Sequence, residues 1–256
     1  MRLSPRLRTP GALRSAGVTA ALGLGLAALG ATSASATVLT FDIDNSKPNN
    51  NIAMIQSYGD RVATTVQGAA TYGVGAEGFT PNVLVSYDDG PQGSLIRWTT
   101  NYGDLVNVLE NEVDSSSYMD IVFTADPGFK VALFGFDLAG WPQADYTLPG
   151  VQVTSGAATL FSQSNVLVQG NAVGPRHTSF SFGSGLTGDT LSLRLNLAGL
   201  GSNSDNIGID NIRFGQVAAP VAPVPEPAGW ALMVLGIGGT GGLLRLQRRR
   251  VMAAAI

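Results

Sequence analysis

Acidic side chains near both ends of the central region are the first candidates for chemistry. Asp42 and Asp44 lie in an early apolar run, and Asp210 lies in a late run, where the period-two apolar pattern slips by one residue. A slip in a strand that keeps burying apolar side chains predicts a β-bulge, which re-aims side chains. If the two runs pair as strands, these oxygens meet, and Ca²⁺ takes about six to eight oxygen ligands. The alternatives are a structural Ca²⁺ site formed by Asp42, Asp44 and Asp210, and ordinary hydrogen bonds of turn and bulge residues.

A second candidate site follows the apolar run 131–141. Trp141 ends this run, and Asp145 and Tyr146 come soon after it. A Trp at the end of a strand, beside acidic and aromatic neighbours, could stack on a sugar ring. The alternatives are a ligand-binding site made by Trp141, Asp145 and Tyr146, and a Trp that closes the edge of the core.

Paired carboxylates are a third option, because two acids that flank a cleft can hydrolyse a glycosidic bond. Spacing does not choose among the candidates, which are Glu77, Glu110, Glu112, Asp114, Asp120 and Asp137. The sequence has one His, His177, and no Cys, which excludes an ordinary zinc site. It also has no G-x-S-x-G elbow and no nucleotide-binding fingerprint. We therefore expect a protein that is not an enzyme, with glycoside hydrolysis as the alternative, and no cofactor other than the candidate Ca²⁺.

Charge narrows the range of partners. Segment 37–219 has 17 acidic and 7 basic residues, which is a formal charge of −10. Nucleic acids and anionic membrane surfaces require a basic field, so we expect this segment to bind neither of them. Cations, neutral polymers and basic molecules remain as classes of partner that this segment could bind.

Short strands are the elements expected to position these residues. Leu191, Leu193, Leu195 and Leu197 alternate with polar residues, which is the period of a half-buried strand. For segment 104–110 the pattern allows either a short helix or a strand. The expected strands are 39–43, 60–66, 82–88, 94–99, 120–125, 131–141, 150–155, 165–169, 191–197 and 207–214. About ten short strands at this spacing predict an all-β domain, a jelly-roll-like β-sandwich, over residues 37–216.

The first 36 residues have the pattern of a signal peptide for the Sec translocon. Residues 1–14 carry four Arg and no acid, and an Ala/Leu/Gly-rich run follows at 16–31. Ala34 and Ala36 are then spaced as A-x-A. We expect cleavage after Ala36, so that the mature protein begins at Thr37.

The C-terminal end has three parts. A Pro-rich linker at 217–227 leads into the uncharged segment 228–244, and residues 245–256 are basic. At a rise of about 1.5 Å per residue, a helix over 228–244 is just long enough for the core of a bilayer. We expect a single transmembrane helix that anchors the precursor in the inner membrane, with the Arg cluster in the cytoplasm. The residues expected to carry the sorting information are Val224, Pro225, Glu226, Pro227, Arg248, Arg249 and Arg250.

This order of a Pro-Glu-Pro motif, a hydrophobic helix and an Arg cluster, in a chain with a signal peptide, resembles the PEP-CTERM sorting signal. The same tail is also called the ice-binding protein C-terminal domain. The resemblance implies a Gram-negative envelope protein that an exosortase recognises and processes near Pro-Glu-Pro, and that then lies at the cell surface or outside the cell. Ice binding is a further alternative, which the scattered Thr residues disfavour.

The central region also resembles exported β-sandwich domains of unknown function in proteins with this tail. The stretches that carry this resemblance are YGDRV (58–62), TPNVLVSY (80–87), FTADPGFKVALFGFDLAGWP (123–142) and IGIDNIRF (207–214). The last stretch is also similar to the final strand of galactose-binding-like and carbohydrate-binding jelly-rolls. The resemblance implies a shared fold and no known activity.

Together these features predict an exported protein of the cell surface or the extracellular space. We expect a structural component or a polysaccharide binder of an exopolysaccharide or biofilm matrix. The alternatives are a Ca²⁺-dependent carbohydrate-binding module and a glycoside hydrolase.

Overall fold

The computed structural model describes residues 36–43, 52–73, 78–88, 90 and 95–220, and the backbone of 227–253 with the side chains of 229–242 and 245. The predictions that lie outside the described residues concern Ala34, Asp44, Glu77, Val224, Pro225 and Glu226, and the side chains of Arg248, Arg249 and Arg250. Thr37, the expected first residue of the mature chain, is buried, and its hydroxyl lies 2.8 Å from the hydroxyl of Thr80.

Strands dominate the described part of the chain. One short 3₁₀ segment, η1 (Gly201–Asn206), and one helix, α1 (Pro227–Ala253), accompany them. The strands are β1 (Thr37–Leu39), β2 (Asp42–Ile43), β3 (Ile52–Ala53), β4 (Val66–Gln67), β5 (Ala70–Thr71), β6 (Val83–Asp88), β7 (Leu95–Trp98), β8 (Val108–Asn111), β9 (Tyr118–Ala125), β10 (Phe129–Gly140), β11 (Tyr146–Ser155), β12 (Ala158–Val168), β13 (Thr178–Gly188), β14 (Thr190–Asn196) and β15 (Ile207–Ala218).

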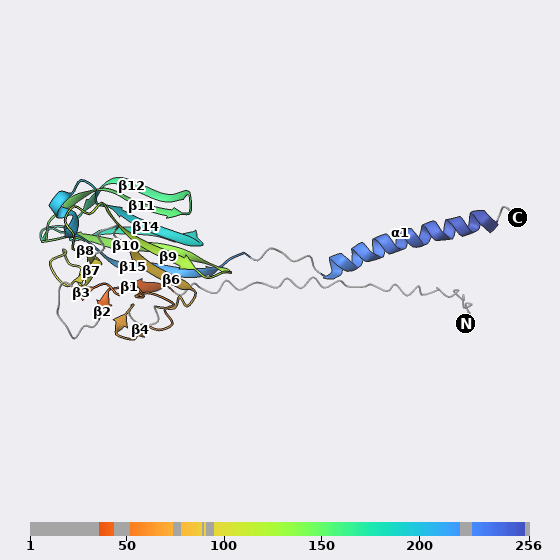
Figure 1. Cartoon of the computed structure of the whole chain (residues 1–256), viewed down its shortest axis with the longest axis horizontal. Coiled ribbons are helices and arrows are strands. Elements are labelled where there is room, and N and C mark those ends of the chain that lie inside the picture. Colours follow the sequence, from red (N-terminus) through yellow and green to blue (C-terminus); the bar gives the residue numbers. More distant parts are fainter. Residues whose placement is uncertain are drawn as a thin grey trace, which may run out of the picture. The chain divides into compact units, whose positions relative to one another are not determined.

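Two antiparallel sheets form the layers of a β-sandwich (Figure 1). The larger sheet has the order β13-β10-β15-β8-β7-β3, and β1 also pairs with β15. The second sheet has the order β12-β11-β14-β9-β6, and β2, β5 and β4 form a small third sheet. The all-β class and the sandwich architecture are therefore as expected.

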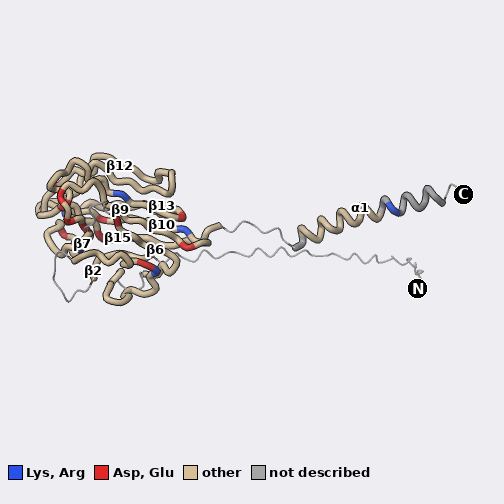
Figure 2. The backbone as a smooth tube through the Cα atoms, in the orientation of Figure 1, with Lys and Arg blue, Asp and Glu red and all other residues tan. Residues whose placement is uncertain are grey.

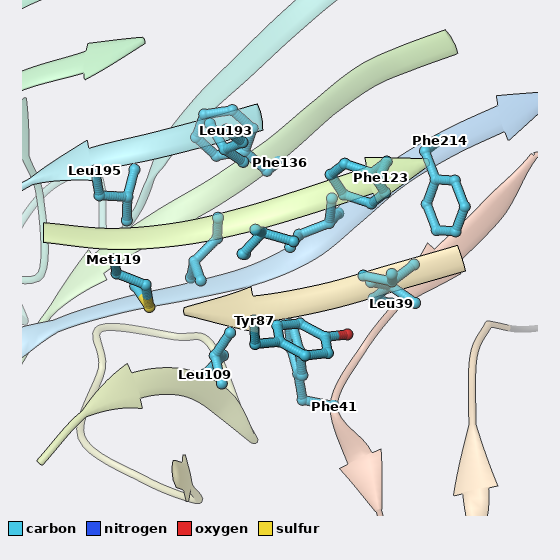
Figure 3. Packing of buried hydrophobic residues seen from close by; sticks show 14 of the residues in the cluster. Leu39, Phe41, Tyr87, Leu109, Met119, Phe123, Phe136, Leu193, Leu195 and Phe214 are labelled. Carbon is cyan, nitrogen blue, oxygen red and sulfur yellow. The ribbon is translucent and has the colours of Figure 1, made fainter. Parts of the chain in front are cut away.

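The core lies between the two larger sheets, because strands on both sides turn alternate residues inward. In β14, Leu191, Leu193 and Leu195 are at most 1% exposed, while the residues between them reach solvent. Figure 3 shows Leu193 and Leu195 in the same buried cluster as Phe136, and Phe123 of β9 beside Phe214 of β15, with 4.9 Å between ring centroids. The period-two pattern of the sequence thus correctly predicted which side chains of β14 are buried.

Strand β15 has the bulge that the slip in its apolar pattern predicts. Between the pairs Gly135–Arg213 and Asp137–Asp210, β15 contains one residue more than β10. The backbone at Asn211 has a φ of 51°, in the left-handed region that Asn tolerates better than most residues. Because of this extra residue, the apolar side chains on both sides of the slip reach the core.

Two of the expected strands, 60–66 and 165–169, differ clearly from the structure. Segment 60–66 contains turns, a single bridge between Val62 and Thr80, and the start of β4 at Val66, and the Arg61 N–H donates to the Val83 carbonyl. Strand β12 begins well before the expected 165–169, since its first half is held by pairing with β11. Of the two alternatives left open for segment 104–110, the structure has the strand, because the segment leads into β8. The last strand of the sandwich ends two residues beyond the expected boundary at 216.

Helix α1 covers the expected segment 228–244 and continues through the Arg cluster. It begins at Pro227, where the missing N–H of proline is not needed for an intrahelical bond. Among the described residues, no helix combines the length and the apolar character needed to cross a membrane. The expected transmembrane helix over 228–244 stays a prediction.

Candidate functional site

Pairing of the first and last strands of the sandwich brings Asp42 near Asp210, as expected. Strand β1 pairs with β15 in the register Leu39 to Ile212, and β2 follows directly. A third acid joins them, because Asp137 of β10 lies opposite Asp210. In this acidic cluster of Asp42, Asp137 and Asp210, Asp137 and Asp210 are 8% and 4% exposed and Asp42 is half-buried.

Protein donors and protonation stabilise the acidic cluster. Ser179 and the Asn211 side chain donate to Asp137, at 2.7 and 3.1 Å. The Asn211 N–H donates to Asp210 Oδ1 at 2.6 Å. Burial, and then the charges of Asp42 and Asp137, raise the pKa of Asp210 to about 8. Asp210 is therefore largely protonated at neutral pH, which relieves the repulsion between facing acids.

The candidate calcium site lies only partly within the described residues. Within the described residues, no group of three or more His, Cys, Asp or Glu is arranged to hold a metal ion. Asp42 accepts a hydrogen bond from the Asn107 side chain, and Asp210 is held by the bulge. These contacts correspond to the alternative of hydrogen-bonded turn and bulge residues. The proposed ligand Asp44 lies outside the described residues, so the calcium site stays a prediction.

A second group of acids lines a pocket of about 210 Å³ at the end of the larger sheet. Five segments meet there: the end of β7, the loop 99–107, β8 with the residues that follow it, the turn after β10, and η1. Beside the pocket lies a small apolar cluster separate from the main core. The residues that line the pocket are Trp98, Tyr102, Glu110, Glu112, Trp141, Asp205 and Asn206.

Aromatic contacts and hydrogen bonds join these segments. The indole rings of Trp98 and Trp141 meet edge to face, with 6.1 Å between centroids and 77° between planes. The backbone N–H of Trp141 donates to the backbone carbonyl of Asn206 at 2.9 Å. The Tyr102 hydroxyl donates to the Asp205 carbonyl at 2.8 Å. The two Trp and Tyr102 are thus positioned by backbone groups and by one another.

Glu110 is the most perturbed acid of the pocket. Its side chain is 2% exposed and contacts both the Tyr102 hydroxyl and the carboxylate of Glu112. Burial is the main cause that raises the pKa of Glu110 to about 8; the contact with Tyr102 opposes it, and the neighbouring charges of Glu112 and Asp205 add to it. Burial also raises the pKa of Asp205, with the charges of Asp114 and Glu112 adding to the effect. Glu110 is therefore mostly protonated at pH 7, beside the exposed carboxylate of Glu112.

Buried polar atoms without a partner gather around this pocket. Within the described residues, the Nε1 atoms of Trp98 and Trp141 and the Oδ1 atom of Asp205 have no hydrogen-bond partner. Native structures pair nearly all such atoms, so each unpaired one calls for an explanation. A ligand that carries both hydrogen-bond acceptors and donors could pair with these two donors and this acceptor.

The sequence-predicted ligand site is brought together in part. Trp141 lines the pocket, and Tyr146 lies behind it, donating to the Trp141 carbonyl at 2.6 Å and accepting from Asn206 at 3.1 Å. Asp145 lies elsewhere and accepts from the N–H groups of Gly170 and Asn171 at 2.9 and 3.0 Å. Trp98, Tyr102, Asp205 and Asn206 were not among the predicted site residues. No motif could have found them, because they come from separate segments.

The acids proposed for glycoside hydrolysis do not all converge. Glu110 and Glu112 share the pocket, and the charge of Asp114 acts on Asp205 at its rim. Asp120 instead forms a two-pronged ion pair with Arg194 on the second sheet, at 2.7 and 2.5 Å. Asp137 belongs to the acidic cluster.

Loop 99–107 is braced from outside the pocket. Arg176 donates through Nη2 to the Gly103 carbonyl at 2.6 Å, and His177 Nδ1 lies 2.8 Å from Asp104 Oδ1. Burial would raise the pKa of Asp104, but the contact with His177 outweighs burial and lowers it. His177 thus belongs to a loop contact, and the same loop presents Tyr102.

Replacing Gly103 with Ala should disturb this brace. A Cβ on Gly103 would lie 1.7 Å from the Arg176 carbonyl oxygen, at a φ of 54° that disfavours side chains. We expect Gly103→Ala to lower the free energy of unfolding by about 1–3 kcal/mol more than Gly156→Ala, measured with denaturant. Gly156 is the matched control, since it has a φ of 55° and open space around its Cβ position. Equal losses for the two variants would contradict the brace.

Comparisons with known proteins give distant likenesses. No model of a known protein family matches this chain, and no curated protein matches it. Among solved structures it is similar to a Stig cyclase, FisC from Fischerella sp. TAU in complex with (3Z)-3-(1-methyl-2-pyrrolidinylidene)-3H-indole. That likeness covers 73% of this chain and 100% of the cyclase, with 16% identity and a TM-score of 0.32. The apo form of a cyclase from Fischerella sp. is similar over 73% of this chain and 99% of its own, with 18% identity and a TM-score of 0.28. Because both TM-scores are low, these likenesses assign neither a fold nor an activity to this chain.

Proposed function

We propose that this chain is an exported, non-enzymatic protein that binds extracellular polysaccharide through the pocket around Trp98 and Trp141. The signal peptide pattern and the PEP-CTERM-like tail support export and exosortase-dependent sorting. Under this proposal the mature protein belongs to the cell surface or the extracellular matrix of a Gram-negative organism. The sandwich itself would be of jelly-roll, galactose-binding-like type.

The observation that carries the proposal is the meeting of two indole rings with carboxyl groups in one pocket. Aromatic faces bind the apolar side of a sugar ring, and polar side chains at the edge bond to its hydroxyl groups. The volume of about 210 Å³ lies below the roughly 300–1,000 Å³ of pockets for drug-sized ligands, so it suits one sugar unit of a chain. A binder of this kind needs no catalytic group.

Removing one indole should abolish most of the binding. We expect Trp141→Ala to weaken polysaccharide binding by the full chain at least about tenfold, which is about 1.4 kcal/mol, because the ring supplies both contact area and an N–H donor. Affinity electrophoresis in gels containing exopolysaccharide measures the change. Trp230→Ala is the matched control, since Trp230 lies on α1 and is 59% exposed. Equal retardation of both variants and the unmodified protein would count against the pocket.

Glycoside hydrolysis is the second candidate, and the state of Glu110 favours it. A buried, protonated Glu beside a second carboxyl group is the pair that a glycosidase uses. Glu110 and Glu112, however, are in hydrogen-bond contact. Carboxyl groups that flank a glycosidic bond stand roughly 5–9.5 Å apart. The contact therefore favours binding over cleavage. Reducing-end release from a polysaccharide panel that is lost in Glu110→Gln would reverse this choice.

A further inference from the structure

We propose that the pocket selects sugars carrying a free, positively charged amino group, such as units of a de-N-acetylated amino-sugar polymer, over neutral and acidic sugars. This inference rests on the proposed function and adds the ligand class. It depends on three properties of the same cavity: its charge, its aromatic walls and its unpaired polar atoms.

Charge is the first property. Three of the residues that line the pocket are acids, and none of the described lining residues is Lys or Arg. Figure 2 shows the wider setting, in which acidic residues outnumber basic ones along the described sandwich. A glycan carboxylate or sulfate placed here would face Glu112 and Asp205 with no basic group to pair with, so acidic polymers are disfavoured.

The aromatic walls act in the same direction. Trp98, Tyr102 and Trp141 line the pocket together with the acids. The face of an indole attracts a cation through its quadrupole, and this attraction grows when the cation is shielded from water. A neutral N-acetyl group gains nothing from the quadrupole or from the carboxylates, whereas an ammonium group gains from both.

The unpaired polar atoms match an amino sugar. An ammonium group has three donors and no acceptor, which suits Asp205 Oδ1 and the carboxylate of Glu112. Sugar hydroxyl and ring oxygens accept hydrogen bonds, which suits the Nε1 donors of Trp98 and Trp141. Each unpaired atom has under 1 Å² of exposed surface, so its side chain must rotate before a ligand can bond to it.

Calorimetric titration of the full chain with three oligosaccharides tests the inference. The probes are a glucosamine hexamer, an N-acetylglucosamine hexamer and a galacturonate hexamer, at about pH 6, where the amines are charged. We expect the glucosamine hexamer to bind at least about tenfold more tightly than the N-acetylated hexamer, and the galacturonate hexamer not to bind. Glu112→Gln keeps the shape and removes one charge, and should weaken glucosamine binding about three- to tenfold. It should leave N-acetylglucosamine binding unchanged.

The control variant is Asp189→Asn, an exposed acid next to Gly188, which pairs with Val131 at the opposite end of β10 from Trp141. It should leave all three affinities unchanged. Equal or tighter binding of the N-acetylated hexamer would overturn the charge selection and leave the proposed polysaccharide binding standing. A glucosamine preference that persists in both Glu112→Gln and Asp205→Asn would assign the effect to overall charge and overturn the pocket as its source. Absence of binding by all three probes, with polysaccharide binding insensitive to Trp141→Ala, would overturn the inference and the proposed function together.

Discussion

Raising the pH from about 5 to about 8 should lower the melting temperature of this protein, because two buried acids hold protons that the unfolded chain releases. The pKa of Glu110 is raised from 4.5 to about 8, and that of Asp210 from 3.8 to about 8, in each case mainly by burial. The two acids belong to different places, the pocket and the acidic cluster. Their effects should therefore add.

The direction follows from the number of bound protons. Between the unfolded and folded pKa values, the folded protein binds more protons than the unfolded chain, so the free energy of unfolding falls as the pH rises. The loss is on the order of 1 kcal/mol per pH unit for each group. Asp104 and Asp126 act in the opposite sense, because ion pairs with His177 and Arg61 lower their pKa values. Their contribution is lost below about pH 4, so we expect maximal stability near pH 5.

Single substitutions test whether these two acids cause the change of melting temperature with pH. Glu110→Gln and Asp210→Asn should each remove about half of the fall in melting temperature, measured by calorimetry between pH 5 and pH 8. Asp189→Asn, which alters an exposed acid, should melt with the slope of the unmodified protein. A melting temperature that stays constant over this range would show that neither acid holds its proton in the folded state.

Leu193→Ala should reduce the free energy of unfolding by roughly 2–5 kcal/mol, because it opens a cavity in the middle of the sandwich. Leu193 is 0% exposed and lies between Val153 and Ile121 on the neighbouring strands of the second sheet. Denaturant unfolding followed by circular dichroism measures the loss. The spread of the expected range reflects how far the surrounding side chains can close the cavity.

The matched control for the core is Leu167→Ala on β12 of the same sheet. Leu167 is 51% exposed, so its truncation should change the free energy of unfolding by at most about 0.5 kcal/mol. Similar losses for the two variants would mean that the core does not lie between the two sheets.

Local patterns in the sequence were sufficient for much of the fold. Alternation of apolar and polar residues is a property of neighbouring positions, so β14 and its buried Leu residues could be read directly. The one-residue slip in the last strand likewise predicted the bulge at Asn211, because the core must still receive apolar side chains on both sides of it. The start of β12 lacks such a pattern and is held by its partner strand β11, which the sequence alone does not identify.

The candidate sites depended on long-range geometry. Asp42 and Asp210 could be expected to meet, because the first and last strands of sandwiches often pair. Asp137 could not, since its place opposite Asp210 follows from register shifts within β10. The position of Trp141 at the end of a strand made it a candidate ligand-binding residue, but the sequence did not show whether a carboxyl group lies beside it.

By itself, the sequence determined the residue types that could bind a sugar and the strands that carry them. Only the tertiary structure decided that Trp141 meets Trp98 and Glu110, and that Asp145 instead holds the loop at Gly170. The physical reason is that a pocket forms where separate segments come together, and their register and loop paths depend on the packing of the whole sandwich. The raised pKa of Glu110 has the same origin, because burial and the neighbouring charge of Glu112 exist only in the folded chain.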